Sequence, residues 1–338
     1  MASYFVRRLL LVIPTFLGIT IMVFIITRFV PGGPIERSIA QMQQMAMESG
    51  TSSKHAGTQI SEEQLKQLKE YYGFDKPVLE SYFTWLTKVF VWDLGNSTRY
   101  YEPVWDIIKE RFPISIFYGV TTMLITYLVC IPLGIYKAIK HNTITDNASS
   151  VLVFIGYAIP GFVLGIILIV IFSSNLGWFP LGEFYSEEFD DLTTWGKIKD
   201  ILHHAALPLT AYTAGSFAVM TFLQKNSLME HISADYVRTA VAKGVPFKTA
   251  VITHALKNSL VPLATHFGNN ISVIIAGSFL IEKVFDINGF GLLGYESVLE
   301  RDYPVVMGIL VLSSILQLIG NILSDVCVAI VDPRVQFT

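Results

Sequence analysis

Polar side chains recur at helical spacing inside two apolar stretches of this sequence. They are His266, Asn269, Asn270, Gln317 and Asn321. His266 and Asn270 lie one turn apart on one face of a helix, and so do Gln317 and Asn321, with Asp325 continuing their spacing. Such groups hydrogen-bond either a polar solute or a neighbouring helix, because unsatisfied polar groups in an apolar environment are costly. Both interpretations stay open.

No pattern in the sequence predicts an enzyme site. The phosphate-binding pattern G-x-x-x-x-G-K-[ST] does not occur, so this chain is not expected to bind or hydrolyse ATP itself. Gly289 and Gly291 lack the strand and helix that frame a nucleotide site. His266 has no second metal ligand at a suitable spacing, and Cys130 and Cys327 are expected to be small buried hydrophobes. We therefore expect no catalytic residue, metal or cofactor in this chain.

The elements that position these groups are apolar. Of 338 residues, 52% are hydrophobic and 15% charged, whereas a soluble domain carries about 25% charged residues. Several runs reach the roughly 20 residues with which a helix crosses a bilayer. The sequence predicts an all-α membrane protein with six transmembrane helices, at 9–30, 113–136, 148–173, 205–223, 259–281 and 305–330. Gly156 and Pro160 are expected to kink the third.

Charge distribution predicts the orientation of these spans. The termini and the even-numbered connections carry ten lysines and arginines against four acidic residues, with a fifth, Asp325, near the cytoplasmic end of the last predicted span; the other 22 acidic residues lie in the odd-numbered connections. Because basic residues mark cytoplasmic loops, both termini are expected in the cytoplasm. The net charge of −3 gives no electrostatic support for a nucleic-acid partner.

The predicted outward-facing segment 31–112 is too polar to be a span. Ser61-Glu62-Glu63-Gln64 fits a capping box and predicts a short helix that ends near Gly73. After Pro77, apolar residues recur at helical spacing up to Phe90. That second stretch predicts a helix that either lies in the membrane interface or packs on the outer face.

The longest predicted cytoplasmic connection, 225–258, reads as two short helices separated by Gly244-Val245-Pro246. Gly244 suits the left-handed position after a helix, and Pro246 suits the first turn of the next one. Small residues before the glycine, Thr239 and Ala240, would let another protein approach the backbone. The segment therefore predicts either a docking element or an ordinary amphipathic loop.

The residue pattern of this loop resembles the EAA loop of ATP-binding-cassette importer permeases. The resemblance is narrower to the B-type permease of the oligopeptide/dipeptide importer family, in YVRTA, AKG and HALKN. In that family the loop forms a coupling helix against the ATPase subunit. The resemblance assigns that role to Tyr236, Arg238, Thr239, Ala240, Gly244, His254 and Asn258. Arg238 replaces the general loop's glutamate and Lys257 its first proline, as is usual in the peptide branch.

The resemblance extends along the whole chain, through PGGP, YGFDKPVLESYFTWL, WDLGNS, IPLGIYKA and VDPR. GYAIP and LLGYE are similar to the YejB-type branch, which takes up peptides including the peptide–nucleotide antibiotic microcin C. The resemblance implies a type I permease fold in the bacterial inner membrane, working by alternating access. It also implies a second homologous permease, ATP-binding subunits that hold ATP and Mg²⁺, and a periplasmic peptide-binding protein. The five polar residues named first are then candidates for the translocation pathway.

On this interpretation the chain has four parts: the N-terminus with the first transmembrane helix (1–30), an outward-facing helical insert (31–112), a five-helix permease core with the coupling loop (113–330) and a cytoplasmic tail (331–338). An ion-gradient-driven secondary transporter is the alternative, although Asp325 is the only acidic residue inside a predicted span. A membrane assembly protein whose loop binds a non-ATPase partner is a further alternative.

Overall fold

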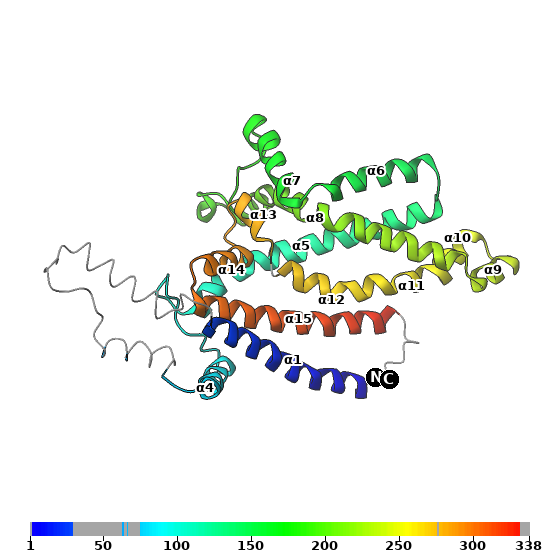
Figure 1. Cartoon of the computed structure of the whole chain (residues 1–338). Coiled ribbons are helices and arrows are strands. Elements are labelled where there is room, and N and C mark those ends of the chain that lie inside the picture. Colours follow the sequence, from blue (N-terminus) through cyan, green and yellow to red (C-terminus); the bar gives the residue numbers. More distant parts are fainter. Residues whose placement is uncertain (1, 30–62, 64–65, 67–74, 276, 332–338) are drawn as a thin grey trace. The chain divides into compact units, whose positions relative to one another are not determined.

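The computed structural model describes residues 2–29, 63, 66, 75–275 and 277–331 (Figure 1). In this part of the chain the regular structure is helical, apart from one isolated β-bridge between Asn96 and Pro103. The all-α prediction is thereby confirmed for the described residues. The helix predicted after Ser61 lies almost wholly outside them.

The helices follow the chain order shown in Figure 1. They are α1 (Ala2–Phe29), α4 (Val78–Phe90), α5 (Val104–Ile139), α6 (Ile144–Ala158), α7 (Gly161–Leu168) with the π-helix η1 (Ile169–Asn175), the short 3₁₀ helix η2 (Phe189–Asp191), α8 (Thr194–Ile232), α9 (Asp235–Ala242), α10 (Phe247–Ala250), the π-helix η3 (Val251–Ala255), α11 (Leu256–Ser259), α12 (Val261–Ile275), α13 (Phe279–Val284), α14 (Phe290–Leu299) and α15 (Tyr303–Val331).

Three helices of the described part, α5, α8 and α15, are long and apolar enough to cross a membrane. The pair formed by α6 and α7–η1 makes a fourth if it counts as one span. In α1, the apolar stretch Leu10–Ile25 is shorter than this criterion requires, and α12 has only 15 residues. The structure thus supports a multi-pass membrane protein, while the count of six spans stays a prediction.

Several predicted boundaries differ from the observed helices. The second predicted span begins at Pro113, but α5 already begins at Val104 because Val104 and Ile108 are buried and extend its apolar face. The fifth predicted span continues to Ile281, whereas α12 ends at Ile275 and Gly277 follows with φ +77°. That left-handed conformation is suited to glycine and ends the helix.

The third predicted span is not one continuous helix. Its two halves, α6 and α7–η1, meet at 95°. The bend between α6 and α7 is visible in Figure 1. Ile159 is extended and Pro160 (φ −53°, ψ 135°) lies outside both helices, as expected where proline restricts the residue before it. Gly161 then approaches α8 so closely that a Cβ there would lie 2.9 Å from the Ala211 carbonyl oxygen.

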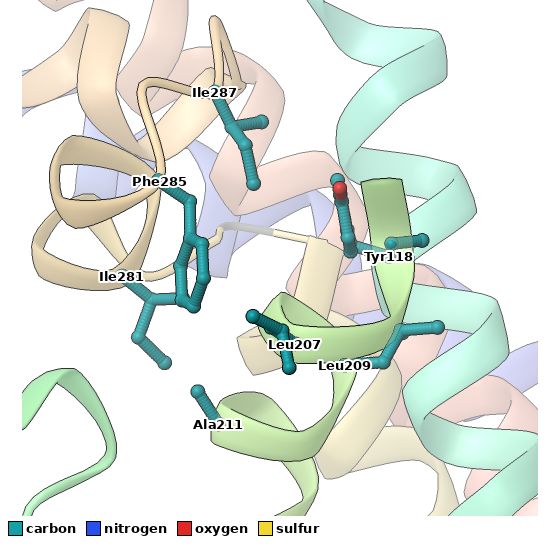
Figure 2. Packing of buried hydrophobic residues seen from close by; sticks show 8 residues of the cluster. Tyr118, Leu207, Leu209, Ala211, Ile281, Phe285 and Ile287 are labelled. Carbon is teal, nitrogen blue, oxygen red and sulfur yellow. The ribbon is translucent and has the colours of Figure 1, made fainter. Parts of the chain in front are cut away.

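The chain divides into two compact units. The first comprises Met1–Leu10, Arg111–Leu293 and Ile315–Thr338. Its largest described core is built by α5, α8 and the segment around α13 (Figure 2), where Tyr118, Leu207, Phe285 and Ile287 are buried together. This core fixes the turn after α13 against the beginning of α8's apolar part.

The second unit comprises Leu11–Glu110 and Gly294–Ser314. Within it, α4 packs on α1 through Tyr82 and Leu86 against Phe24. Thr20 and Tyr82 share a buried hydrogen bond of 3.0 Å. The predicted helix after Pro77 is therefore present, and one of its faces packs against another helix.

Candidate functional site

The segment between α8 and α12 is folded throughout. α8 continues to Ile232, α9 follows, and α10, η3 and α11 succeed one another with no residue between them. Figure 1 shows α9 and α10 at one end of α8. The predicted pair of helices around Gly244 is observed, with the second extended by a π-helical turn. Pro246 stands at the N-cap of α10, one position before the predicted first turn.

The reversal after α9 is a Schellman motif. Gly244 has φ +90°. Its N–H donates to the Val241 carbonyl at 2.9 Å, and the Val245 N–H donates to the Ala240 carbonyl at 3.1 Å. These two bonds satisfy carbonyl groups that the end of a helix otherwise leaves unpaired. The sequence expectation for Gly244 is met, and the turn direction of the loop is fixed.

A small hydrophobic core holds the loop on the helices that precede it. Leu228 of α8, Val237 of α9, Val251 and Ala255 of η3 and Ala138 of α5 are buried together. Fully burying one such valine or leucine stabilises a fold by roughly 1.5–3 kcal/mol in water. The position of α9 is therefore set by packing against α5 and α8.

Two of the predicted loop residues meet, and most of the others are exposed. The Tyr236 hydroxyl lies 2.8 Å from His231 Nδ1, and Asn258 Nδ2 donates to that hydroxyl at 3.4 Å. Arg238 is exposed and reaches Asp235 only at 3.9 Å. Thr239, Gly244 and His254 are also exposed, and Ala240 is half-buried. The surface of α9 is thus available to a partner.

Apolar side chains of α9, α10 and η3 are exposed as well. Val241 is 39% exposed, Phe247 49% and Ile252 51%. Where such exposed apolar groups form a contiguous patch, they mark a protein-contact or membrane-contact surface. What the loop can do chemically is therefore binding: the geometry offers backbone and apolar contacts to another protein.

Of the candidate pathway residues, Gln317 and Asn321 are in contact with each other, and Asn270 is bonded to a neighbouring helix. Asn270 donates to the Tyr127 hydroxyl at 3.4 Å, while Gln317 donates to Asn321 at 3.2 Å on its own helix, α15. His266 is exposed. Asn269 belongs to α12, and its side chain lies outside what the structure describes. For Asn270 and Gln317, bonds within the bundle are the observed use.

Helices α12 and α15 approach each other through small residues instead. A Cβ on Gly268 would overlap the Gly320 carbonyl, and Ser324 Oγ donates to the Thr265 carbonyl at 2.6 Å. Small residues and hydroxyl groups at such crossings are typical of helix pairs in membranes. The sequence analysis missed this contact, for which the signal is a glycine or serine on each helix.

Sequence reasoning also missed the use of three charged residues. In the sequence analysis, Lys137, Asp146 and Lys225 only contributed to the charge count of the cytoplasmic side. In the structure all three are buried. A lysine or aspartate next to a span is ordinary, so the sequence carries no signal for their contact.

Long apolar helices joined by a folded loop with an exposed surface define a multi-pass membrane protein. Comparison with known proteins gives this class its family. Residues 130–337 match the family described as binding-protein-dependent transport system inner membrane component, and the chain belongs to that family. It is a transport permease subunit of the inner membrane.

Relatives match over the whole chain. The peptidoglycan transport system permease protein YejB of Agrobacterium fabrum is 38% identical, covering 100% of this chain and 99% of the relative. The inner membrane ABC transporter permease protein YejB of Escherichia coli O157:H7 is 39% identical over the same shares. The oligopeptide transport system permease protein AppB of Bacillus subtilis is 34% identical, covering 100% of each chain. The resemblance to peptide-importer permeases seen in the sequence is confirmed.

Proposed function

We propose that this chain is the permease subunit through which an ATP-driven importer moves peptides or peptide-like compounds, of the microcin C kind among them, across the inner membrane. The observation that carries the proposal is the loop around Gly244. The Schellman motif fixes its backbone, and buried Val237 holds α9 against α5 and α8. Tyr236, Arg238 and Thr239 stay exposed. A rigid helix with an exposed surface is suited to transmit a movement of a bound partner subunit.

The peptide part of the proposal is supported by the relatives, whose names give peptidoglycan and oligopeptide transport as their activities. The ATP-driven part is supported by the relative named as an ABC transporter permease. Because this sequence has no phosphate-binding loop, ATP and Mg²⁺ would bind to a partner subunit. A second homologous permease would complete the pore, and a periplasmic binding protein would deliver the peptide.

The mechanism follows from a two-state equilibrium. ATP binding to the partner subunits would move α9, and the core it shares with α5 and α8 would carry this movement into the spans. A ligand shifts such an equilibrium only by its different affinities for the two states. Alternating access therefore requires that the ATPase bind the loop differently when the pathway faces inward and outward.

Purification of the tagged chain from membranes tests the assembly. We expect a second permease and an ATPase to co-purify, with ATP-dependent peptide uptake after reconstitution into vesicles. An isolated, folded chain that takes up solute on an ion gradient alone would instead establish the secondary transporter.

The substitution Gly244→Asp tests the coupling loop. The glycine is exposed and a Cβ there meets no atom within 4 Å, so the protein should fold, with a backbone cost of about 1–2 kcal/mol at positive φ. We expect normal insertion and at least about tenfold slower uptake, the effect of a lost coupling of roughly 1.4 kcal/mol.

Gly95→Asp is the matched control, because Gly95 has φ +81° and equally open surroundings but lies in the predicted outward-facing segment. It should carry the same backbone cost and leave the ATP-driven uptake rate near that of the wild type. Equal uptake by the Gly244→Asp and Gly95→Asp proteins would remove the coupling role from the loop.

A further inference from the structure

Two lysines and one aspartate form a buried cluster where α5, α6 and α8 meet. Lys137 is 0% exposed, Asp146 1% and Lys225 7%. The side chains come from the last turn of α5, the first turn of α6 and the cytoplasmic part of α8. Charged groups are rarely buried without a strong structural reason.

The Asp146 carboxylate is the centre of this cluster. Lys225 Nζ donates to both of its oxygens, at 2.9 and 2.8 Å, and Lys137 Nζ lies 3.0 Å from Oδ1. The Asn142 N–H donates to Oδ2 at 3.1 Å. One carboxylate therefore ties α8 to α6, to the end of α5 and to the turn between α5 and α6.

Lys137 is bound by α6 independently of the carboxylate. Its Nζ donates to Ser149 Oγ at 2.8 Å, to Ser150 Oγ at 2.7 Å and to the Asp146 carbonyl at 2.8 Å. Lys225, in contrast, has Asp146 as its hydrogen-bond acceptor in the described structure. The link from α8 to α6 at this point thus depends on the Lys225–Asp146 pair.

The cluster adjoins the hydrophobic core that holds α9 against α5 and α8. Ala138 follows Lys137 on α5, and Leu228 lies one turn after Lys225 on α8, and both contribute to that core. Three residues before Lys137 on α5, Gly134 approaches Gln224 so closely that a Cβ would lie 2.7 Å from the Gln224 Cβ. The same stretches of α5 and α8 therefore hold both the cluster and the loop.

Stability alone does not account for the cluster. Replacing a buried ion group by apolar residues of similar volume is often neutral or stabilising, and here two cations share one anion. We propose that Lys137, Asp146 and Lys225 are positioning residues that lock α6 to α5 and α8, so that a movement of α9 displaces the three helices together. This inference rests on the proposed function, since it concerns how the push on the loop reaches the spans.

The variant Lys225→Met tests this role. It removes the link between α8 and α6, keeps most of the side-chain volume, and leaves Lys137 and Asp146 as a balanced pair, so it should fold. In proteoliposomes containing the importer complex, with radiolabelled oligoalanine as probe, we expect the ATP hydrolysed per peptide taken up to rise about fivefold or more. The thermal midpoint of the complex should change little.

A double variant separates positioning from charge balance. Asp146→Asn alone leaves two buried lysines without an anion, whereas Asp146→Asn with Lys225→Met restores the original net charge of the cluster without the link. We expect the double variant to fold and to show the same raised ATP-to-peptide ratio as Lys225→Met. The matched control Lys140→Met, at an exposed lysine of the same turn, should keep the wild-type ratio.

Each outcome decides the inference. A wild-type ratio in Lys225→Met or in the double variant would overturn it, and so would a Lys225→Met protein that does not fold, since the role would then be structural. The proposed function fails separately, if the wild-type complex hydrolyses ATP and takes up no oligoalanine or other peptide.

Discussion

At the scale of single residues, buried Glu282 explains why the segment after α12 is rich in glycine. Its carboxylate is 1% exposed and accepts the Leu292 N–H at 2.6 Å and the Tyr212 hydroxyl at 3.3 Å. A Cβ at Gly277 or Gly289 would collide with this carboxylate. The glycines thus make room for a buried acid that holds the turn together.

This environment predicts a pH-dependent stability. Burial raises the pKa of Glu282 from 4.5 to about 7, although the N–H and hydroxyl donors oppose the shift. Between pH 4.5 and 7 the folded protein holds a proton that the unfolded chain has released, so stability falls as pH rises through this window. The loss from this group is about 3 kcal/mol.

The variant Glu282→Gln isolates the effect, because a neutral amide cannot titrate. The thermal midpoint of the wild type, measured in detergent from pH 4.5 to 8, should fall relative to that of Glu282→Gln as pH rises from 4.5 to 7, and the two curves should run parallel above pH 7. Curves that stay parallel over the whole range would show that Glu282 does not titrate there.

Residue contacts of this kind could not be predicted from the sequence. Glu282 and Tyr212 are 70 positions apart, and Lys225 and Asp146 are 79 apart. Local pattern placed Asp146 and Lys225 near the cytoplasmic side and Glu282 after a span. Their pairing depends on which helices become neighbours, and periodicity within one helix does not contain that information.

At the scale of elements, the local sequence predicted helix ends well where a glycine or proline determines the backbone conformation. Gly244 and Pro246 predicted the reversal after α9, and Pro77 the beginning of α4. The local sequence did not predict helix boundaries where tertiary packing extends or ends a helix. Pro113 lies inside α5, because buried Val104 and Ile108 continue the helix beyond the predicted beginning.

Helix α4 has one apolar face that is buried and another that is exposed. This arrangement bears on whether the helix packs on another helix or lies in the membrane interface. Tyr82 and Leu86 pack on α1, while Leu79, Phe83 and Phe90 are 73%, 60% and 69% exposed. A helix that only packed on the outer face would leave its other side polar. The second face predicts that α4 also lies in the membrane interface.

Site-directed fluorescence tests this placement. A fluorophore attached at Phe83→Cys should be quenched by brominated lipids, and one at Glu80→Cys, on the exposed polar side of the same helix, should be quenched less. Equal quenching at the two positions would mean that α4 has no side facing lipid. Tyr82→Cys is not suitable, because it would remove the buried bond to Thr20.

At the scale of the whole molecule, the proposal depends on how often the chain crosses the bilayer between α5 and α8. The bent pair α6 and α7–η1 is either a broken span or a re-entrant loop. A broken span keeps the loop around Gly244 on the side of the ATPase. With a re-entrant loop, α8 would carry this loop to the opposite face, where no ATP is available.

Cysteine labelling distinguishes the two cases. Lys140 and Asp190 are exposed and lie on either side of the bent pair, and Lys248 is exposed on α10 beyond α8. With a membrane-impermeant maleimide, cysteine at Asp190 should react in intact cells, and cysteines at Lys140 and Lys248 only in inverted vesicles. Labelling of the Lys140 and Asp190 positions from the same side would make the pair re-entrant. The chain would then have an odd number of spans, and the coupling function proposed for α9 would be untenable.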